Sequence, residues 1–165
     1  MIKITWHSGE PPASMAVRQV YAIAFNEDEK VFLRYDTKNK LYGMFGGTPE
    51  KYDSDRIATL KREFLDEANT TLKEPIYLVG YQVIEGDGEI PNYVQLRMVA
   101  LIDRIGEKKP DHDNGEIYER VFASPEKAIK LLNWRDTGEK QIREAYKILN
   151  EKFGIVTTNF ETESV

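Results

Sequence analysis

Three acidic side chains stand close together in the middle of the chain, at Glu63, Asp66 and Glu67. On a helix, residues three and four apart project from neighbouring turns of one face. Like charges at this spacing cost about a few tenths of a kcal/mol per pair unless a cation lies beside them. Carboxylate oxygens are ligands that Mg²⁺ prefers, together with water and substrate phosphate oxygens. The pattern points to metal-assisted phosphate chemistry, and its alternative is a solvated acidic face.

A helix that follows a glycine loop is predicted to position these acids. An apolar stripe recurs at steps of three and four along the segment, formed by Ile57, Leu60, Phe64 and Ala68. Ser54 is the expected N-cap. The preceding Gly46-Gly47 pair does not suit the interior of a helix or a strand, so a loop leads directly into the acidic helix.

This stretch resembles the signature of the Nudix hydrolase family, G-x5-E-x7-R-E-U-x-E-E-x-G-U, in which U is aliphatic. Gly47 falls on the opening glycine, and residues 62–67, Arg-Glu-Phe-Leu-Asp-Glu, fall on R-E-U-x-E-E with Asp66 replacing a Glu. Upstream, residues 42–47 are similar to the family's aromatic-Gly-aliphatic-Pro-Gly-Gly entry, with Phe45 in the proline position. Residues 119–128 resemble its closing strand and Ser-Pro-Glu-x-Ala helix start. The resemblance spans about residues 17 to 153.

The chain departs from the signature at three further places. Counting forward from Gly47 puts Asp53 in the loop Glu position, whereas counting back from Arg62 puts Ser54 there, so the loop is one residue longer than the pattern. Asn69 stands at the late glycine, which is a mild change because Asn tolerates a left-handed helix end. Thr70 replaces the last aliphatic residue.

The resemblance implies Mg²⁺- or Mn²⁺-dependent hydrolysis of a phosphoanhydride bond in a nucleoside diphosphate derivative, by attack of water on phosphorus. It implies that Asp66, Glu67 and the Gly47 carbonyl bind the metal. Glu63 becomes a third ligand or the base that orients water, and Arg62 orients Glu63 or its neighbours through a charge-assisted hydrogen bond. Family members often add a late acid, for which Glu116 is favoured here; its competitors are Glu119, Asp111 and Asp113.

Substrate contacts are expected outside the signature. Arg34 and Arg97 lie on strand patterns and are candidates for phosphate binding, with packing or an interface as the alternative use. Glu50 and Asp53 are candidates to replace the missing loop Glu in the lengthened loop. Trp134, after two leucines, is expected to anchor the core or its rim.

The composition bounds the class of protein. A chain of 165 residues suits a single domain, here residues 1–165 with a core over about 17–153, a peripheral strand over 1–6 and a peripheral tail over 154–165. The net charge of −5 gives no reason to expect nucleic-acid or membrane partners. No cysteine, signal pattern or membrane-length apolar run is present, so we expect a cytoplasmic protein with a small nucleotide derivative as partner. Homodimers are common among the proteins it resembles.

Hydrophobic patterns predict the order of elements. Strands are expected over 17–25, 31–34, 41–45, 76–84, 93–105 and 117–122, and helices are expected after Ser124 and over 137–153. This order indicates an α+β fold with a mixed β-sheet flanked by helices. The resemblance implies the same arrangement, a Nudix-like α/β/α sandwich.

Two functions therefore follow from the sequence. The first is an active Nudix-type pyrophosphohydrolase with Mg²⁺ or Mn²⁺ as cofactor. The second is a Nudix-like nucleotide-binding or regulatory module with weakened catalysis, suggested by Asp66, Asn69 and the altered loop. If the acids are only structural, no divalent cation binds and none raises the melting temperature.

Overall fold

A computed structural model describes residues 2–154 of the chain. It contains the helices and strands in the order β1 (Lys3–Ser8), β2 (Val17–Phe25), β3 (Val31–Asp36), β4 (Leu41–Gly43), β5 (Phe45–Gly47), α1 (Arg56–Ala68), β6 (Thr70–Glu85), β7 (Tyr93–Ile105), β8 (Glu119–Ala123), α2 (Pro125–Leu132) and α3 (Arg135–Phe153). The predicted α+β class is confirmed, because eight strands form a mixed sheet with helices packed against it.

The sheet runs in the order β1-β6-β7-β2-β3-β4, with β5 added to β2 and β8 added to β3. Neighbouring strands are antiparallel except β2 and β7, which run parallel from Val17 to Phe25. At the far end, β2 and β3 share only the pair Phe25 and Val31 before they separate. In the gap that opens between them, β5 pairs with β2 and β4 pairs with β3, while β8 pairs with the other edge of β3.

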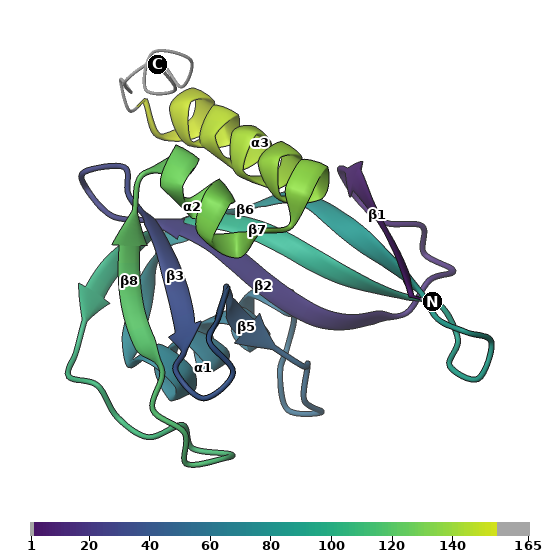
Figure 1. Cartoon of the computed structure of the whole chain (residues 1–165), viewed down its shortest axis with the longest axis horizontal. Coiled ribbons are helices and arrows are strands. Elements are labelled where there is room, and N and C mark those ends of the chain that lie inside the picture. Colours follow the sequence, from purple (N-terminus) through teal and green to yellow (C-terminus); the bar gives the residue numbers. More distant parts are fainter. Residues whose placement is uncertain (1, 155–165) are drawn as a thin grey trace.

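The sheet lies between two layers of helix, with α1 on one face and α2 and α3 on the other (Figure 1). Strand residues alternate between these layers. In β7, Leu96 and Met98 join the core under α1, whereas Val99 joins the core under α2 and α3. Within residues 2–154, no helix is both long enough and apolar enough to span a membrane.

Most predicted elements are present, with different boundaries. The expected strand over 41–45 is split into β4 and β5, because Gly43 pairs with β3 while Phe45 pairs with β2. The strand expected to begin at residue 76 begins at Thr70, which pairs with Ile105 of β7. The peripheral N-terminal strand is β1, at the edge of the sheet. The expected tail falls mostly on residues 155–165, outside the described residues.

Candidate active site

Helix α1 has defined ends that fix the direction of its acidic face. Asp55, rather than the predicted Ser54, is the N-cap, since its carboxylate accepts a hydrogen bond from the Ala58 N–H at 2.8 Å. Asn69 ends the helix with φ 46°, as the sequence predicted for this position. The Arg120 guanidinium donates to the last helical carbonyl, on Ala68, at 2.9 Å. The Asp55 cap and Arg120 of β8 thus hold the two ends, so the acids between them have a fixed orientation.

Glu67 reaches from α1 to the glycine pair of β5. One of its oxygens accepts from the Gly46 N–H at 3.1 Å, and the other accepts from the Arg34 guanidinium at 3.3 Å. The side chain is only 7% exposed, and burial raises the pKa of Glu67 to about 7 although Gly46 and Arg34 oppose the shift. The raised pKa means that the positive charge around this carboxylate is too small to compensate for the hydration that it loses on burial.

Glu63 lies against the second glycine of the pair. A Cβ atom added to Gly47 would stand 2.6 Å from a Glu63 carboxylate oxygen, so only glycine leaves room for this carboxylate. Burial raises the pKa of Glu63, and the Arg62 guanidinium, which donates to it at 2.9 Å, works in the opposite direction. The glycine pair thus brings Glu63 and Glu67 to the same stretch of backbone.

Arg62 links the loop to the helix. Its guanidinium donates two hydrogen bonds to Asp53, at 3.0 and 2.9 Å, and a third to the Thr48 carbonyl. These bonds hold the pKa of Asp53 well below its usual range. Of the two residues that the counts place in the loop Glu position, Asp53 is the one that contacts Arg62.

Asp66 lies at the outer side of this cluster. Its nearest cation is Arg62, at 3.9 Å, and burial raises the pKa of Asp66. The negative charges of Asp111 and Asp113, in the loop before β8, act on Asp66 in the same direction. Asp113 and Glu116 are both exposed, and Glu119 pairs with Lys108 at 2.8 Å. Among the four late acids, Asp111 and Asp113 are the two whose charges act on the helix acids.

The oxygen donors at this site suit a hard divalent cation. Within residues 2–154, no three acidic or imidazole side chains converge closely enough to form a complete metal cage. Mg²⁺ does not require one, because it commonly takes one or two carboxylates and keeps several waters. Glu63 and Glu67, both buried, both with raised pKa and both held at the glycine pair, supply that number. The residues present therefore fit Mg²⁺ or Mn²⁺.

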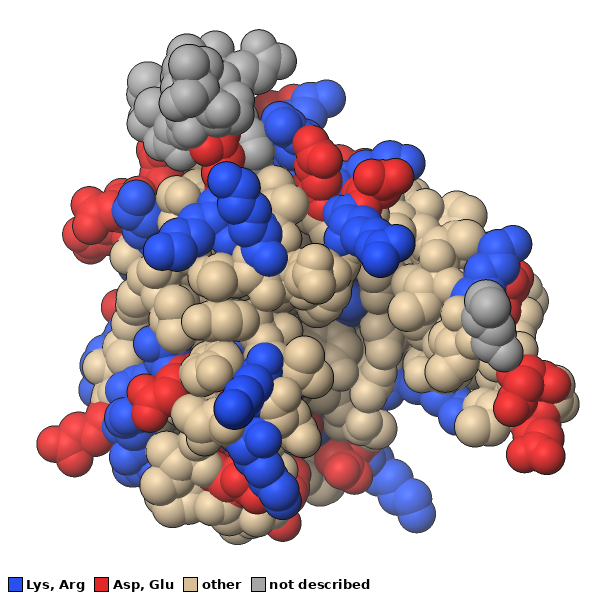
Figure 2. All heavy atoms as spheres, in the orientation of Figure 1, with Lys and Arg blue, Asp and Glu red and all other residues tan. Residues whose placement is uncertain are grey.

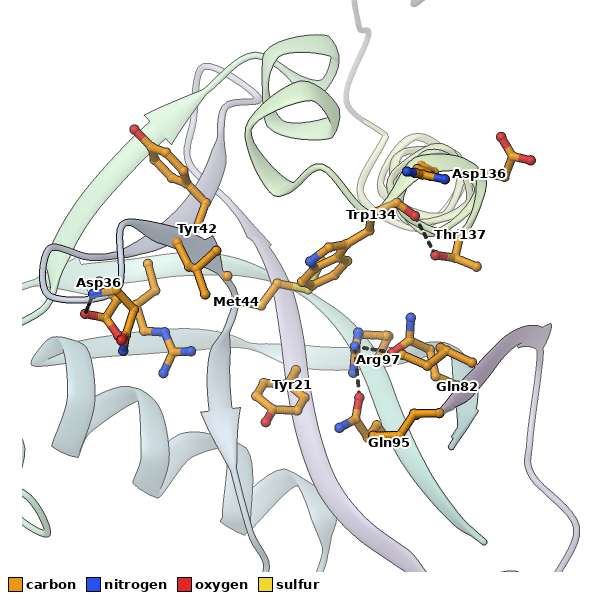
Figure 3. A pocket seen from close by; sticks show the side chains of 17 residues that line it. Tyr21, Asp36, Tyr42, Met44, Gln82, Gln95, Arg97, Trp134, Asp136 and Thr137 are labelled. Atoms are coloured by element: carbon orange, nitrogen blue, oxygen red, sulfur yellow. Dashed lines mark hydrogen bonds between the residues drawn. The ribbon is translucent and has the colours of Figure 1, made fainter. Parts of the chain in front are cut away.

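A cavity of about 990 Å³ opens on the α2 and α3 side of the sheet, and Arg34, which contacts Glu67, is part of its lining. Its lining includes Tyr21, Arg34, Met44, Arg97 and Trp134, several of which are shown in Figure 3. Tyr21 also lies against Gly46, since a Cβ atom on that glycine would stand 2.8 Å from the tyrosine ring. Tyr21, through Gly46, and Arg34, by direct contact, therefore both connect the cavity with Glu67.

The structure places the three predicted substrate residues differently. Arg34 and Arg97 both line the cavity, and Arg34 also contacts Glu67. The Glu50 side chain is exposed, and it is the backbone of Glu50 that engages the loop, by donating to Asp53 at 2.9 Å. Trp134 lies at the rim between α2 and α3, in contact with the core and lining the cavity.

Several solved structures share this architecture. A pyrophosphohydrolase from Bacillus subtilis superposes with a TM-score of 0.67 at 14% identity, covering 87% of this chain and 90% of that one. A putative NUDIX hydrolase from Listeria monocytogenes gives 0.61 at 20% identity, covering 81% and 94%. The fold is that of the Nudix hydrolases. An Ap4A hydrolase from C. elegans shares it as well, with a TM-score of 0.55 at 14% identity and coverage of 82% and 99%.

The Nudix fold agrees with the resemblance found in the sequence, although no family profile and no curated protein matches the chain. The divergence is understandable at the signature itself, where the loop has an extra residue and Asp66 replaces a Glu.

The sequence did not indicate one residue that lies near α1, Tyr118. The Tyr118 ring packs under the Arg34 guanidinium at 4.9 Å from its centroid. Tyr118 comes from the loop before β8, so no spacing along the chain relates it to Arg34.

Proposed function

We propose that this protein is a Mg²⁺- or Mn²⁺-dependent hydrolase that cleaves a phosphoanhydride bond in a nucleoside diphosphate derivative, by attack of water on phosphorus. The observation that carries the proposal is the pair of buried carboxylates, Glu63 and Glu67, held side by side on the glycine pair. Neighbours of the same fold described as a pyrophosphohydrolase and an Ap4A hydrolase support the same class of bond.

In this proposal the acids of α1 hold the cation. Glu63, Asp66, Glu67 and the Gly47 carbonyl provide hard oxygen donors, with Asp111 or Asp113 rather than Glu116 as the late acid. When bound, the cation would neutralise charge on the diphosphate oxygens. Arg62 acts as a positioning residue, because it is fixed by two bonds to Asp53 and holds Glu63 through a third group of its fork.

Arg34 is suited to contact the substrate between the acids and the cavity. Its Nη1 atom donates to Glu67, whereas its Nε atom is buried and has no hydrogen-bond partner among the described residues. A buried N–H without a partner costs about 1–3 kcal/mol, so an oxygen of a bound diphosphate would relieve it. A guanidinium also presents its donors in a geometry that matches phosphate.

The decisive experiment is a panel of NTPs, nucleotide sugars, ADP-ribose and dinucleoside polyphosphates, assayed for release of phosphate or mononucleotide with and without Mg²⁺. We expect Mg²⁺-dependent turnover of at least one compound and a loss of about 10²-fold or more in Glu67→Gln and Glu63→Gln. Glu74→Gln is the matched control, since Glu74 is exposed and pairs only with Lys61 among the described residues. Turnover that survives in both test variants would refute the assignment.

A specific observation also favours a second candidate, a nucleotide-binding or regulatory module with weak catalysis. Each buried acid already has a protein cation beside it, Arg62 at Glu63 and Arg34 at Glu67. If these pairs persist when a nucleotide binds, the protein would bind the nucleotide without Mg²⁺ and turn over no member of the panel. Nucleotide binding that is unchanged in Glu67→Gln would then favour the module. A cytoplasmic location and a homodimer belong to both candidates.

A further inference from the structure

Arg97 is a cationic side chain buried at the floor of the cavity. It projects from β7 toward the α2 and α3 layer and is 3% exposed. Its Nε atom donates to Gln141 at 2.9 Å, and its Nη2 atom donates to Gln82 at 2.8 Å and to Gln95 at 3.3 Å. The remaining terminal nitrogen, Nη1, has only a 3.3 Å contact to the Leu96 carbonyl. Donor capacity is therefore left on the guanidinium.

The partners of Arg97 orient its charge but do not neutralise it. All of them are neutral amides or a carbonyl, and within residues 2–154 no carboxylate lies within 4 Å of this guanidinium. Burial accordingly lowers the pKa of Arg97 to about 10. A buried charge is normally paired, because an unpaired one loses its hydration without compensation.

A guanidinium already occupies the position beside the Tyr21 and Trp134 rings of the cavity. The Arg97 guanidinium lies 4.9 Å from the Tyr21 ring centroid and 5.6 Å from that of Trp134. Figure 3 shows these side chains meeting from β2, β7 and the start of α3. A planar base cannot stack between rings that hold a guanidinium, so this end of the cavity is built to bind a polar group. In Figure 2 the hollow between the helices and the sheet is mostly uncharged, with basic atoms at its floor.

A second group beside Arg97 also lacks a partner. The oxygen of the fully buried Gln141 faces Arg97, and its Nε2 atom has no hydrogen-bond partner among the described residues. Because the Gln141 oxygen accepts from Arg97, the orientation of the Gln141 amide is fixed. The group of Gln141 that remains without a partner is therefore its N–H donor and not its oxygen. The groups around the guanidinium that still lack partners are thus all hydrogen-bond donors, and they lie beside a positive charge.

We propose that Arg97 binds an oxyanion, a phosphate or a carboxylate, carried by the substrate on the part that lies away from the hydrolysed diphosphate. This inference rests on the proposed function for the identity of the substrate. It names the class: nucleoside diphosphate derivatives with an additional anionic group. The geometry places that group across Tyr21 from Glu67, since Tyr21 contacts Gly46 on one side and Arg97 on the other.

Binding of the anion is tested first, without any turnover. Inorganic phosphate is titrated into metal-free protein in EDTA and followed by calorimetry and by tryptophan fluorescence. We expect millimolar or tighter binding, at least tenfold weaker in Arg97→Gln, and a fluorescence change that is lost in Trp134→Phe, which retains Trp6. Arg18→Gln is the matched control, because Arg18 also lies over a tyrosine, Tyr93, but on the exposed surface. Binding that is equal in Arg97→Gln and the control would overturn the proposal.

Substrate preference is tested with pairs that differ in one anion. CoA is compared with dephospho-CoA and NADP with NAD for a phosphate, and UDP-glucuronate with UDP-glucose for a carboxylate. We expect kcat/KM to favour the anionic member of one pair by about 10- to 100-fold, and Arg97→Gln to abolish that ratio mainly through KM. The pair that responds identifies the anion.

The outcomes separate this inference from the proposed function. Turnover with no anion preference in any pair, together with no phosphate binding at Arg97, would overturn the inference and leave the hydrolase intact. Phosphate binding that depends on Arg97 in a protein with no turnover would support the anion site and refute the hydrolase. If Arg97 only holds the fold together, Arg97→Gln lowers the melting temperature while the preference ratio is unchanged, which also overturns the inference.

Discussion

Alanine substitutions at the two adjacent glycines of β5 are expected to have different effects, a loss of stability at Gly46 and a loss of activity at Gly47. In Gly46→Ala the new Cβ would stand 2.1 Å from the Val20 carbonyl oxygen and 2.6 Å from the Tyr21 Cα, both on the backbone of the central strand β2. Gly46 also has φ +150°, which side-chain-bearing residues rarely adopt. Backbone strain of about 1–3 kcal/mol and overpacking of about 1–3 kcal/mol then add, for a loss of roughly 2–6 kcal/mol. This corresponds to a fall in Tm of about 5–20 °C for a chain of this size.

Gly47→Ala meets a different obstacle. Its Cβ would collide with the Glu63 carboxylate, which is the far end of a flexible side chain, and the backbone there needs no left-handed conformation. Glu63 can move aside at a cost that we expect to stay below about 1 kcal/mol, because the displaced atoms are the end of a flexible side chain and no backbone has to shift. It would then leave the glycine pair, and a displacement of about 1 Å at a catalytic group lowers kcat by about 10²-fold.

Both variants are compared with wild type by thermal unfolding and by turnover of the best substrate from the panel. We expect Gly46→Ala to lose stability, and we expect Gly47→Ala to keep its Tm within a few degrees while losing about 10²-fold in kcat. If Gly47→Ala retains full activity, the placement of Glu63 at this backbone has no catalytic meaning. If Gly46→Ala is as stable as wild type, the packing described for β2 and β5 is wrong.

Three further predictions concern the charges. Asp53→Asn should lower Tm by about 3–12 °C, because it weakens a bidentate charged pair worth about 1.5–3 kcal/mol, and Asp55→Asn, which keeps an N-cap acceptor, is the control. In metal-free protein, the Glu67 pKa of about 7 lies above its value in the unfolded chain, so the protonated form of Glu67 stabilises the fold at low pH. As the pH rises from 5 to 8, the free energy of unfolding, measured with denaturant, should fall by roughly 3 kcal/mol because of this group. The fall should be absent in Glu67→Gln. A flat difference between wild type and Glu67→Gln over this range would contradict that reasoning. Mg²⁺ should raise the Tm of wild type at pH 8 and leave the Tm of Glu63→Gln/Glu67→Gln unchanged, whereas an equal rise in both proteins would place the ion elsewhere.

The sequence predicted the parts of the site that depend on local spacing. The acids of α1 lie on one face because they recur at helical intervals, and Asn69 ends the helix because it tolerates positive φ. The sequence could not show that Asp55 rather than Ser54 is the N-cap, because both residue types cap helices. Only the path of the loop decides which side chain faces the Ala58 N–H.

The parts that depend on distant residues could not be predicted. The split of residues 41–45 into β4 and β5 follows from pairing with two different strands. The late acids belong to a loop about 45 residues further along the chain than the acids of α1, so their positions depend on the path of that loop. The sequence favoured Glu116, whereas in the structure the charges of Asp111 and Asp113 act on Asp66. The burial of Arg97 requires Gln82 and Gln141, which no periodicity connects with it.

The most direct test of the account is a titration of the metal-free protein with Mn²⁺, followed by the electron paramagnetic resonance signal of the free ion. We expect wild type and Glu74→Gln to bind Mn²⁺ alike and Glu63→Gln/Glu67→Gln to bind it at least roughly tenfold more weakly. Equal Mn²⁺ binding by all three proteins, or none by wild type, would contradict the claim that the acids at the glycine pair form a metal site.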